Sequence, residues 1–301
     1  MSLAVILLNW RDEQRTLRCA RDVAGWPAPA PSLIVVDNES NEASRRALSA
    51  VQAAASLIFS AENLGYAGGN NRGLKRAQAL AADHVMLLNT DAEIAAADVD
   101  RLVAALDAHP DIAVVGPLVE EIAGGRSTFF AGGRDIARYS QSRNAIDPAA
   151  LDRFAADTLR DVDYVSGTVL VMRTALLREI GFLDEAYFFS GEVADFCRRV
   201  RSKGHRLCVD LAVTARHHVD ETPGRLRETL YAYYGYRNRL LYVDKHHADA
   251  RAGYFCRWTL RAVAACGWAL VRGKFARARA ILLAVIDAYA GRYGNRNAKF
   301  L

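Results

Sequence analysis

The chain has few cysteines, and their spacing excludes the common cysteine-built sites. The five are scattered and odd in number: Cys19, Cys197, Cys208, Cys256 and Cys266. No CxxC pair occurs among them, so neither a zinc knuckle nor a disulfide framework is indicated. Such a set is typical of a reducing compartment, and we expect a cytoplasmic protein, either free or peripheral on the inner face of the membrane.

Long apolar runs are also missing. The N-terminal run ends at Asn9 without a basic leader, so we interpret it as a first strand and not as a signal peptide. The longest later run, AVAACGWALV at 262–271, is too short to span a bilayer alone. Because 51% of the residues are hydrophobic, the composition indicates a globular chain with a sizeable core.

The standard phosphate-binding fingerprints are absent. The segment NLGYAGGNNRG, at 63–73, is rich in glycine and precedes a predicted helix, so its exposed amides would favour phosphate oxygens. However, its spacing is not GxGxxG, and Leu74 stands where a P-loop requires lysine. The sequence therefore supports neither a dehydrogenase nor an ATPase. The alternative for this segment is a tight glycine turn.

Strand and helix patterns alternate through the first 116 residues. Continuous apolar runs predict strands at 3–9, 32–38, 56–60, 84–91 and 112–117. A helix is predicted from Asn71 to Ala82, and an irregular insertion at 118–162. This alternation predicts an α/β fold with a mostly parallel sheet flanked by helices on both faces.

Four successive strands are followed by Asn or Asp. The residues at these ends are Asn9-Trp10, Asp37-Asn38, Asn63 and Asn89-Thr90-Asp91. Ligands bind beyond the carboxyl ends of strands in open parallel sheets, so four such ends favour a site over ordinary turns. Asp91 could hold a divalent cation that bridges two phosphates, because oxygen ligands suit Mg²⁺ and Mn²⁺. Its alternative is a turn or helix cap.

The segment FFSGEVADFCRR, at 188–199, carries two carboxylates. Glu192 and Asp195 share one face if the segment is helical, because they are three residues apart. Asp195 also stands four residues before Arg199, as expected for an ordinary ion pair within a helix. The pair therefore predicts either acid–base chemistry or a helix start with a salt bridge.

The C-terminal segment makes the chain basic, with a net charge of +5 overall. Residues 251–301 hold ten Lys and Arg and one acid, Asp287. Amphipathic helices at 254–272 and 275–290 carry these cations beside apolar residues, which suits an anionic membrane surface. The alternative is a helical cap packed on the sheet or on the partner in a homodimer. No nucleic acid is expected, because no reading element accompanies the charge.

Nine segments, in order, resemble the family 2 inverting glycosyltransferases of the GT-A fold, in the bacterial rhamnosyltransferase-like branch. They are VILLNW (5–10), VVDNES (35–40), NLGYAGGNNRG (63–73), LLNTDAEI (87–94), VSGTVLVMR (165–173), GFLDEAYFF (181–189), GEVADFCRR (191–199), HHVDET (217–222) and YYGYRNRLLY (233–242). The resemblance implies a nucleotide-sugar-binding and catalytic domain at 1–245, followed by a basic amphipathic helical extension at 246–301.

The resemblance also implies roles for single residues. The residues expected at the nucleotide are Asn9, Trp10, Asp37, Asn38, Asn63, Gly65, Gly69, Asn70, Asn89 and Arg237. Asp91 is expected to bind Mg²⁺ or Mn²⁺ together with His217, with Thr222 nearby and His218 as the alternative ligand. For Arg237, the alternative is a solvated basic helix face.

The implied reaction transfers a sugar, such as rhamnose, from a nucleoside-diphosphate donor to a saccharide or lipid-linked acceptor in cell-surface polysaccharide synthesis. The family usually has an acid as its base where this chain has Val193. We therefore expect Glu192 to be the base, with Asp195 as the second candidate. The alternative function is a non-catalytic nucleotide-sugar-binding scaffold.

Overall fold

The computed structural model describes residues 2–154, 157–219 and 224–300. Its first half contains β1 (Leu3–Asn9), α1 (Glu13–Ala24), β2 (Ser32–Asp37), α2 (Glu42–Leu48), β3 (Ala55–Phe59), α3 (Gly65–Ala79), β4 (His84–Leu88), β5 (Ala92–Glu93), α4 (Ala96–Ala108) and β6 (Ile112–Ala123). The remainder contains β7 (Arg126–Gly133), β8 (Arg143–Ile146), β9 (Leu159–Asp161), β10 (Val169–Arg173), α5 (Leu176–Ile180), α6 (Glu192–Ser202), β11 (Arg206–His218), α7 (Arg225–His246), α8 (Arg251–Val271) and α9 (Phe275–Tyr289).

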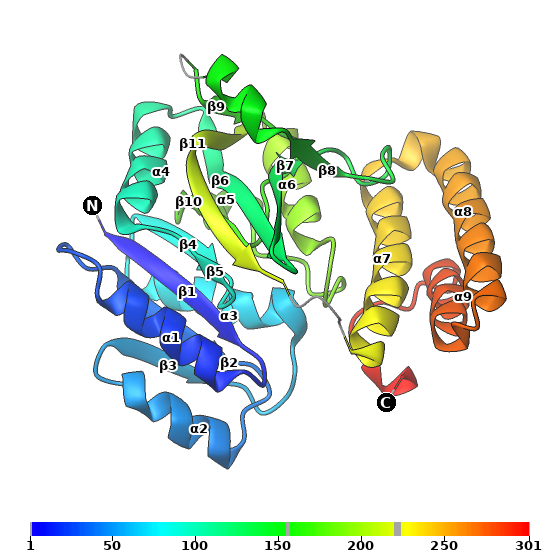
Figure 1. Cartoon of the computed structure of the whole chain (residues 1–301), viewed down its shortest axis with the longest axis horizontal. Helices are drawn as coiled ribbons and strands as arrows, with labels where there is room; N and C mark the ends of the chain where they lie inside the picture. The colour runs from blue at the N-terminus through cyan, green and yellow to red at the C-terminus, as the bar shows by residue number, and fades with distance from the viewer. Residues whose placement is uncertain (1, 155–156, 220–223, 301) are drawn as a thin grey trace.

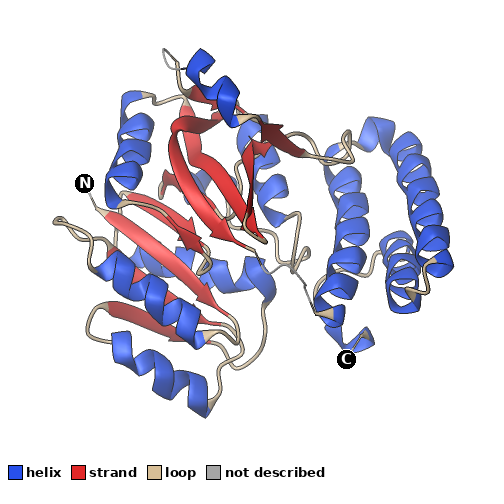
Figure 2. Ribbon diagram, in the orientation of Figure 1, coloured by secondary structure: helices blue, strands red, loops and turns tan. Residues whose placement is uncertain are grey.

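The strands form one mixed sheet whose main path runs β3–β2–β1–β4–β10–β6–β11–β5. Strands β3, β2, β1 and β4 are mutually parallel, and β6 is parallel to β11. Strand β10 runs antiparallel between β4 and β6. Helices cover both faces, as Figure 2 shows. The predicted α/β fold with a mostly parallel sheet is therefore confirmed.

Each face of the sheet has its own apolar core. In β1, Ala4 and Ile6 pack with residues of α3, α5 and α6, whereas Val5 and Leu7 pack with residues of α1, α2 and α4. Side chains alternate along a strand, so an uninterrupted apolar run serves both cores at once. The two helix layers hold the polar ends of the strands in fixed positions.

Helix α3 begins at Gly65, earlier than the sequence predicts. Its glycines allow the helix to lie directly on the sheet. A Cβ atom at Gly69 would come within 2.4 Å of Leu8 Cδ1, and one at Gly73 within 2.5 Å of Ile6 Cγ2. The glycine-rich segment is therefore the sheet-facing side of a helix, and the predicted alternative of a tight glycine turn is wrong.

The predicted irregular insertion at 118–162 contains a β-hairpin and two further short strands. Strand β6 continues to Ala123 and turns at Gly124 and Gly125 into the antiparallel β7, which pairs in turn with β8. Both glycines have positive φ values, 57° and 69°. Two residues in this conformation form the tight turn of a β-hairpin, which explains why the glycines looked like loop signals.

Helices α7, α8 and α9 stand together beside the sheet (Figure 1). The predicted pair of C-terminal helices is confirmed as α8 and α9. Tyr242 of α7 packs in one apolar cluster with Tyr187, near the sheet, and with Trp258 of α8. The predicted division at residue 245 therefore falls between helices that pack on each other. Within the described residues, no helix has the length and apolar character to cross a membrane.

Candidate active site

The parallel strands β3, β2, β1 and β4 are neighbours, so their carboxyl ends meet at one edge of the sheet. Asn9 and Asp37 stand in register at the ends of β1 and β2. Asn89 follows β4 and is joined to the start of β10, because its amide donates to Thr168 O at 2.9 Å. The structure thus brings together the polar strand ends that the sequence indicates, at the edge where ligands bind in open α/β sheets.

Asp37 is the centre of a buried network. Its Oδ1 accepts from Asn9 Nδ2 at 2.8 Å and its Oδ2 from Ser44 Oγ at 2.6 Å. Thr16 Oγ1 donates to Asn9 Oδ1 at 2.7 Å, which fixes the orientation of that amide. Asp37 is only 1% exposed. It therefore braces the floor of the site, and its contact with a nucleotide base stays a prediction.

Asn38 connects the end of β2 to the start of α3. Its Nδ2 donates to Asn63 Oδ1 and Gly65 O, both at 3.1 Å, and its Oδ1 accepts from Leu64 N at 2.8 Å. Asn63 Oδ1 also accepts from Gly65 N at 2.8 Å, and Tyr66 N donates to a carbonyl between α5 and α6. These amides are occupied by protein groups in this structure, and phosphate binding at this helix start stays a prediction.

Three of the predicted nucleotide contacts remain at least partly accessible: Trp10, Asn63 and Asn89. Trp10 is 46% exposed at the end of β1, where its Nε1 donates to a carboxylate oxygen of Glu39 at 2.9 Å. An indole held in this way offers a flat face on which a base can stack. Asn89 is half-buried beside it in the sheet. Gly69 and Asn70, in contrast, are buried within α3.

Asp91 and His217 meet where β5 pairs with the end of β11. His217 Nε2 lies 3.3 Å from Asp91 Oδ1, and Arg15 Nη1 lies 3.8 Å from Asp91 Oδ2. Burial alone would raise the pKa of Asp91, but the hydrogen bond and charge of His217, with the charge of Arg15, lower it below its usual value. His218 instead lies 3.3 Å from Glu93 Oε1. The structure therefore brings the imidazole of His217, and not that of His218, to the Asp91 carboxylate, while the backbone amide of His218 donates to Asp91 O.

A divalent cation at this place would have two protein donors, Asp91 and His217. Across residues 2–154, 157–219 and 224–300, no three His, Cys, Asp or Glu side chains lie close enough to hold a metal by themselves. Two donors fit Mg²⁺ or Mn²⁺ held jointly with a diphosphate, because such ions often keep one or two protein ligands plus substrate oxygens. Thr222, predicted nearby, lies outside the described residues.

Glu192 begins α6, and one oxygen of its buried carboxylate has no hydrogen-bond partner among the described residues. Its side chain is 6% exposed, and Oε2 accepts no hydrogen bond from any described residue. Desolvation raises the pKa of Glu192 to about 7, against the lowering effect of its own backbone amide and with a further rise from the charge of Asp195. A carboxylate that titrates near neutral pH has the proton affinity expected of a general base.

Tyr66 lies within the electrostatic influence of both Glu192 and Asp91. Sequence reasoning did not select this residue. Its hydroxyl donates to Gly167 O at 2.8 Å. Burial raises the pKa of Tyr66, and the charges of Glu192 and Asp91 raise it further. One phenol thus lies within electrostatic reach of both carboxylates. Its position inside the glycine-rich segment was the available signal.

Val193 is buried among apolar residues. It packs in the core between the sheet and α6. A Cβ atom on Gly167 would lie 3.1 Å from its Cγ2. The position where the family usually has its base is therefore part of the apolar interior in this chain.

Asp195 is the centre of a buried ion-pair cluster. Arg199 Nε donates to it at 2.9 Å, Tyr187 OH at 3.2 Å and His246 Nε2 lies 2.8 Å away, while Lys245 Nζ also donates. Burial would raise the pKa of Asp195, but the hydrogen bonds from His246 and Lys245 and the charges of Lys245 and Arg199 hold it far below its usual value. The predicted ion pair with Arg199 is confirmed, and this geometry joins α6 to α7.

Arg237 is fully buried, and its donors are committed to the protein. Its Nε donates to Asn238 Oδ1 at 2.8 Å, its Nη1 to Gly294 O at 2.6 Å, and its Nη2 to Ala186 O and Tyr187 O at 3.1 and 2.8 Å. The alternative of a solvated helix face is therefore wrong, whereas the contact with donor phosphates stays a prediction. Arg237 instead ties α7 to two distant backbone segments.

Asn238 holds the loop that leads into α6. Its Nδ2 donates to the carbonyls of Tyr187, Phe189 and Ser190 at 3.0, 2.7 and 2.5 Å. Phe188 and Ser190 have positive φ values of 62° and 69°. Such backbone costs roughly 1–3 kcal/mol per residue and persists only where its surroundings enforce it. The hydrogen bonds from Asn238 hold this backbone in place, and the sequence offered no signal for this role.

The chain resembles curated proteins over most of its length. It is 25% identical over 284 residues to the low-salt glycan biosynthesis hexosyltransferase Agl10 of Haloferax volcanii, covering 91% of this chain and 85% of that protein. It is 24% identical over 273 residues to the N-acetylglucosaminyl-diphospho-decaprenol L-rhamnosyltransferase of Mycobacterium tuberculosis, covering 85% and 88%.

Solved structures share the fold. The mannosyltransferase PcManGT of Pyrobaculum calidifontis, in complex with GDP-Man and Mn²⁺, superposes with a TM-score of 0.59 at 15% identity, over 95% of this chain and 86% of that one. GalNAc-T7 with UDP, GalNAc and Mn²⁺ gives 0.62 at 14% identity over 81% of this chain, which spans only 48% of that longer protein. These likenesses support the GT-A-type fold alone.

The model of the family described as glycosyl transferase family 2 matches residues 2–165, more than half of the chain. The matched part carries the polar strand ends, Tyr66 and Asp91. It ends before Glu192 and His217, so the case for those two residues comes from the geometry above. The chain belongs to glycosyl transferase family 2, whose members transfer a sugar from a nucleotide-sugar donor.

Proposed function

We propose that the chain is an inverting glycosyltransferase in which Glu192 is the general base and Asp91 and His217 hold a divalent cation. The observation that carries the proposal is the buried Glu192 carboxylate, whose Oε2 accepts no hydrogen bond from the described residues and whose pKa is raised to about 7. The Tyr66 hydroxyl, which senses the charges of both Glu192 and Asp91, supports one continuous site.

The reaction is a single displacement. The acceptor hydroxyl oxygen forms a bond to the anomeric carbon and gives its proton to Glu192 Oε2. The bond from that carbon to the diphosphate oxygen breaks, and its electron pair leaves with the nucleoside diphosphate. One displacement inverts the anomeric configuration and needs no covalent sugar intermediate. A positioned base of this kind contributes roughly 10²–10⁴-fold to the rate.

Asp91 and His217 are the proposed metal donors. A bound Mg²⁺ or Mn²⁺ would supply neutralisation of the charge on the leaving diphosphate. Arg15, on the other oxygen of Asp91, fixes the orientation of this carboxylate. Because the pKa of Asp91 is lowered, the carboxylate is ionised at neutral pH without a metal and is ready to bind one.

The specific substrates are inferred from the relatives. The mycobacterial relative is named for an L-rhamnosyl group and a decaprenol-linked acceptor, and the haloarchaeal one as a hexosyltransferase of glycan biosynthesis. We therefore infer a hexose or deoxyhexose donor and a saccharide or lipid-linked acceptor in cell-surface polysaccharide synthesis.

A donor panel tests the proposal. The protein is incubated with UDP-, GDP- and dTDP-sugars, Mn²⁺, and saccharide or polyprenyl-diphosphate-sugar acceptors, and nucleoside diphosphate release is measured. We expect turnover with at least one donor, and NMR of the product should show the inverted anomer. Donor binding without turnover on any acceptor would favour the binding scaffold that Val193 suggests. A retained anomer would exclude the single displacement.

A further inference from the structure

Helices α8 and α9 expose an apolar surface that the proposed reaction does not use. We call it the α8–α9 face, and its members are Leu260, Val263, Leu270, Val271, Phe275, Leu282, Ile286 and Tyr289. Their exposed fractions run from 46% at Ile286 to 83% at Val271. Few other large hydrophobic side chains of the described residues are this exposed, so the concentration here calls for a partner.

The side chains of the two helices form one continuous face. At the seam between the helices, Thr259 Oγ1 lies 2.9 Å from Tyr289 OH, and Cys266 Sγ lies 3.6 Å from Ala278 O. Residues four positions apart share one side of a helix. Four positions beyond each of these seam residues lies a member of the α8–α9 face: Val263 follows Thr259, Leu270 follows Cys266, and Leu282 follows Ala278. Both helices therefore contribute to the same side of the seam.

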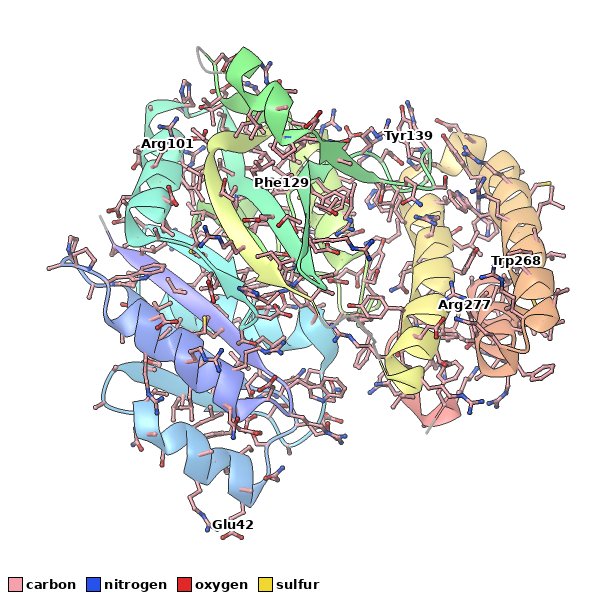
Figure 3. The ribbon with its side chains drawn as sticks, viewed as in Figure 1. Glu42, Arg101, Phe129, Tyr139, Trp268 and Arg277 are labelled. Carbon is pink, nitrogen blue, oxygen red and sulfur yellow. The ribbon has the colours of Figure 1, made fainter. Side chains whose placement is uncertain are left out.

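Cations border the face. Arg257, Arg261 and Arg272 follow one flank of α8, and Arg279 lies within the exposed side of α9. Trp268 is 60% exposed on the side of the molecule away from the sheet (Figure 3), with the Arg272 guanidinium 4.2 Å from its ring centroid. A tryptophan beside arginines at the edge of an apolar face suits the boundary between lipid headgroups and acyl chains.

The α8–α9 face itself carries no acid. The one acid of residues 251–301, Asp287, is buried and paired with Lys299. Glu228 of α7, the carboxylate beside the turn, is already paired with Lys274 and Arg277. A second copy of the chain would therefore bring Arg257, Arg261, Arg272 and Arg279 against the same arginines of its partner. An anionic lipid surface offers the opposite charge and an apolar layer below it. Charge complementarity thus favours an anionic lipid surface over a second copy of the chain.

We propose that the α8–α9 face lies on the surface of an anionic lipid bilayer, with the turn between Val271 and Phe275 inserted among the headgroups. The contact is interfacial, since no described helix can cross a membrane. The proposal extends the proposed function, because a lipid-linked acceptor would be held at the same surface. Its test needs neither donor nor acceptor, so it can fail while the glycosyltransferase activity stands, and the reverse.

Vesicle co-sedimentation of the full chain tests the proposal. The probes are phosphatidylcholine vesicles with and without about one third phosphatidylglycerol. We expect binding to the anionic vesicles that falls steeply with added salt, and little binding to phosphatidylcholine alone. The double variant Val271→Ser/Phe275→Ser should weaken anionic binding at least about tenfold, since each basic or buried apolar contact is worth roughly fivefold. Arg272→Glu/Arg279→Glu should do the same.

A matched control is Leu80→Ser, a 38%-exposed leucine at the end of α3, which should bind vesicles like the wild type. All altered side chains are exposed, and circular dichroism verifies that the variants fold. Equal binding to both vesicle types, or to neither, would overturn the proposal. So would a dimer in light scattering that the Val271→Ser/Phe275→Ser variant dissociates, because the face would then belong to a second copy.

Discussion

Glu192 and Asp195 lie three residues apart on α6, yet the pKa of Glu192 is raised and the pKa of Asp195 is lowered. Burial by itself raises the pKa of both carboxyl groups. Asp195 is compensated by Arg199, Lys245, His246 and Tyr187, whereas Oε2 of Glu192 has no hydrogen-bond partner among the described residues. The same helix therefore carries one carboxylate that holds the structure together and one that can exchange a proton near neutral pH.

The first prediction concerns Glu192 as a base. Glu192→Gln keeps the shape of the side chain but cannot accept a proton, so kcat should fall roughly 10²–10⁴-fold. In the wild type, kcat/KM should rise with pH through the pKa of Glu192, about 7, because the protonated form is inactive. Donor affinity, measured by calorimetry, should change little. A variant with unaltered turnover and an unaltered pH profile would remove Glu192 from the mechanism.

The second prediction concerns stability. The folded-state pKa of Glu192, about 7, lies above the ordinary value of 4.5. Between these values the folded protein binds a proton that the unfolded chain does not, so stability falls as pH rises through this window and stays lowered above it. Glu192→Gln should therefore raise the free energy of unfolding at pH 8 by up to about 3 kcal/mol.

Urea denaturation at pH 8 and near pH 4.5 checks this effect. Little difference between variant and wild type is expected at the lower pH, where Glu192 is protonated in the folded protein. A Glu192→Gln variant that is less stable than the wild type at pH 8 would contradict a buried carboxylate with one unpartnered oxygen.

The third prediction separates the two adjacent histidines. Asp91→Asn and His217→Ala should each weaken Mn²⁺ binding in the presence of a nucleoside diphosphate by about tenfold or more, because each removes one of two protein donors. His218→Ala is the matched control, since His218 lies against Glu93 and not Asp91. Electron paramagnetic resonance of Mn²⁺ reports the binding directly. A larger loss for His218→Ala than for His217→Ala would reverse the assignment.

The fourth prediction tests the structural role of Arg237. Arg237→Met removes one donor from each of three backbone carbonyls. Ala186 O and Tyr187 O keep other donors, whereas Gly294 O has no other donor among the described residues, so the free energy of unfolding should fall by about 1–3 kcal/mol. Urea denaturation measures the loss. At temperatures where the variant remains folded, its affinity for nucleoside diphosphate should match the wild type. A stable variant with weakened nucleotide binding would support the phosphate-binding interpretation.

Much of this molecule can be predicted from its sequence, and the exceptions have physical causes. The parallel strands follow from apolar runs, and the meeting of Asp91 with His217 was expected from the resemblance to the family. The glycines of α3 could not be interpreted uniquely from the sequence, because close helix–sheet contact and phosphate binding both require the absence of a side chain. The burial of Arg237 could not be predicted either. A cation can be buried where backbone carbonyls surround it, and those carbonyls belong to residues that are distant in the sequence.

Asn238 and Arg237 also bear on how this protein can be recombined with its relatives. The strained loop before Glu192 is held by side chains of α7, and α7 is in turn fixed by Gly294 O near the C-terminus. A chimaera joined before α7 would take the loop from one parent and the α7 side chains that hold it from another. We expect Glu192 to be misplaced in such a protein. Productive exchanges should therefore keep the segment from Tyr187 through α7 and the region around Gly294 from a single parent.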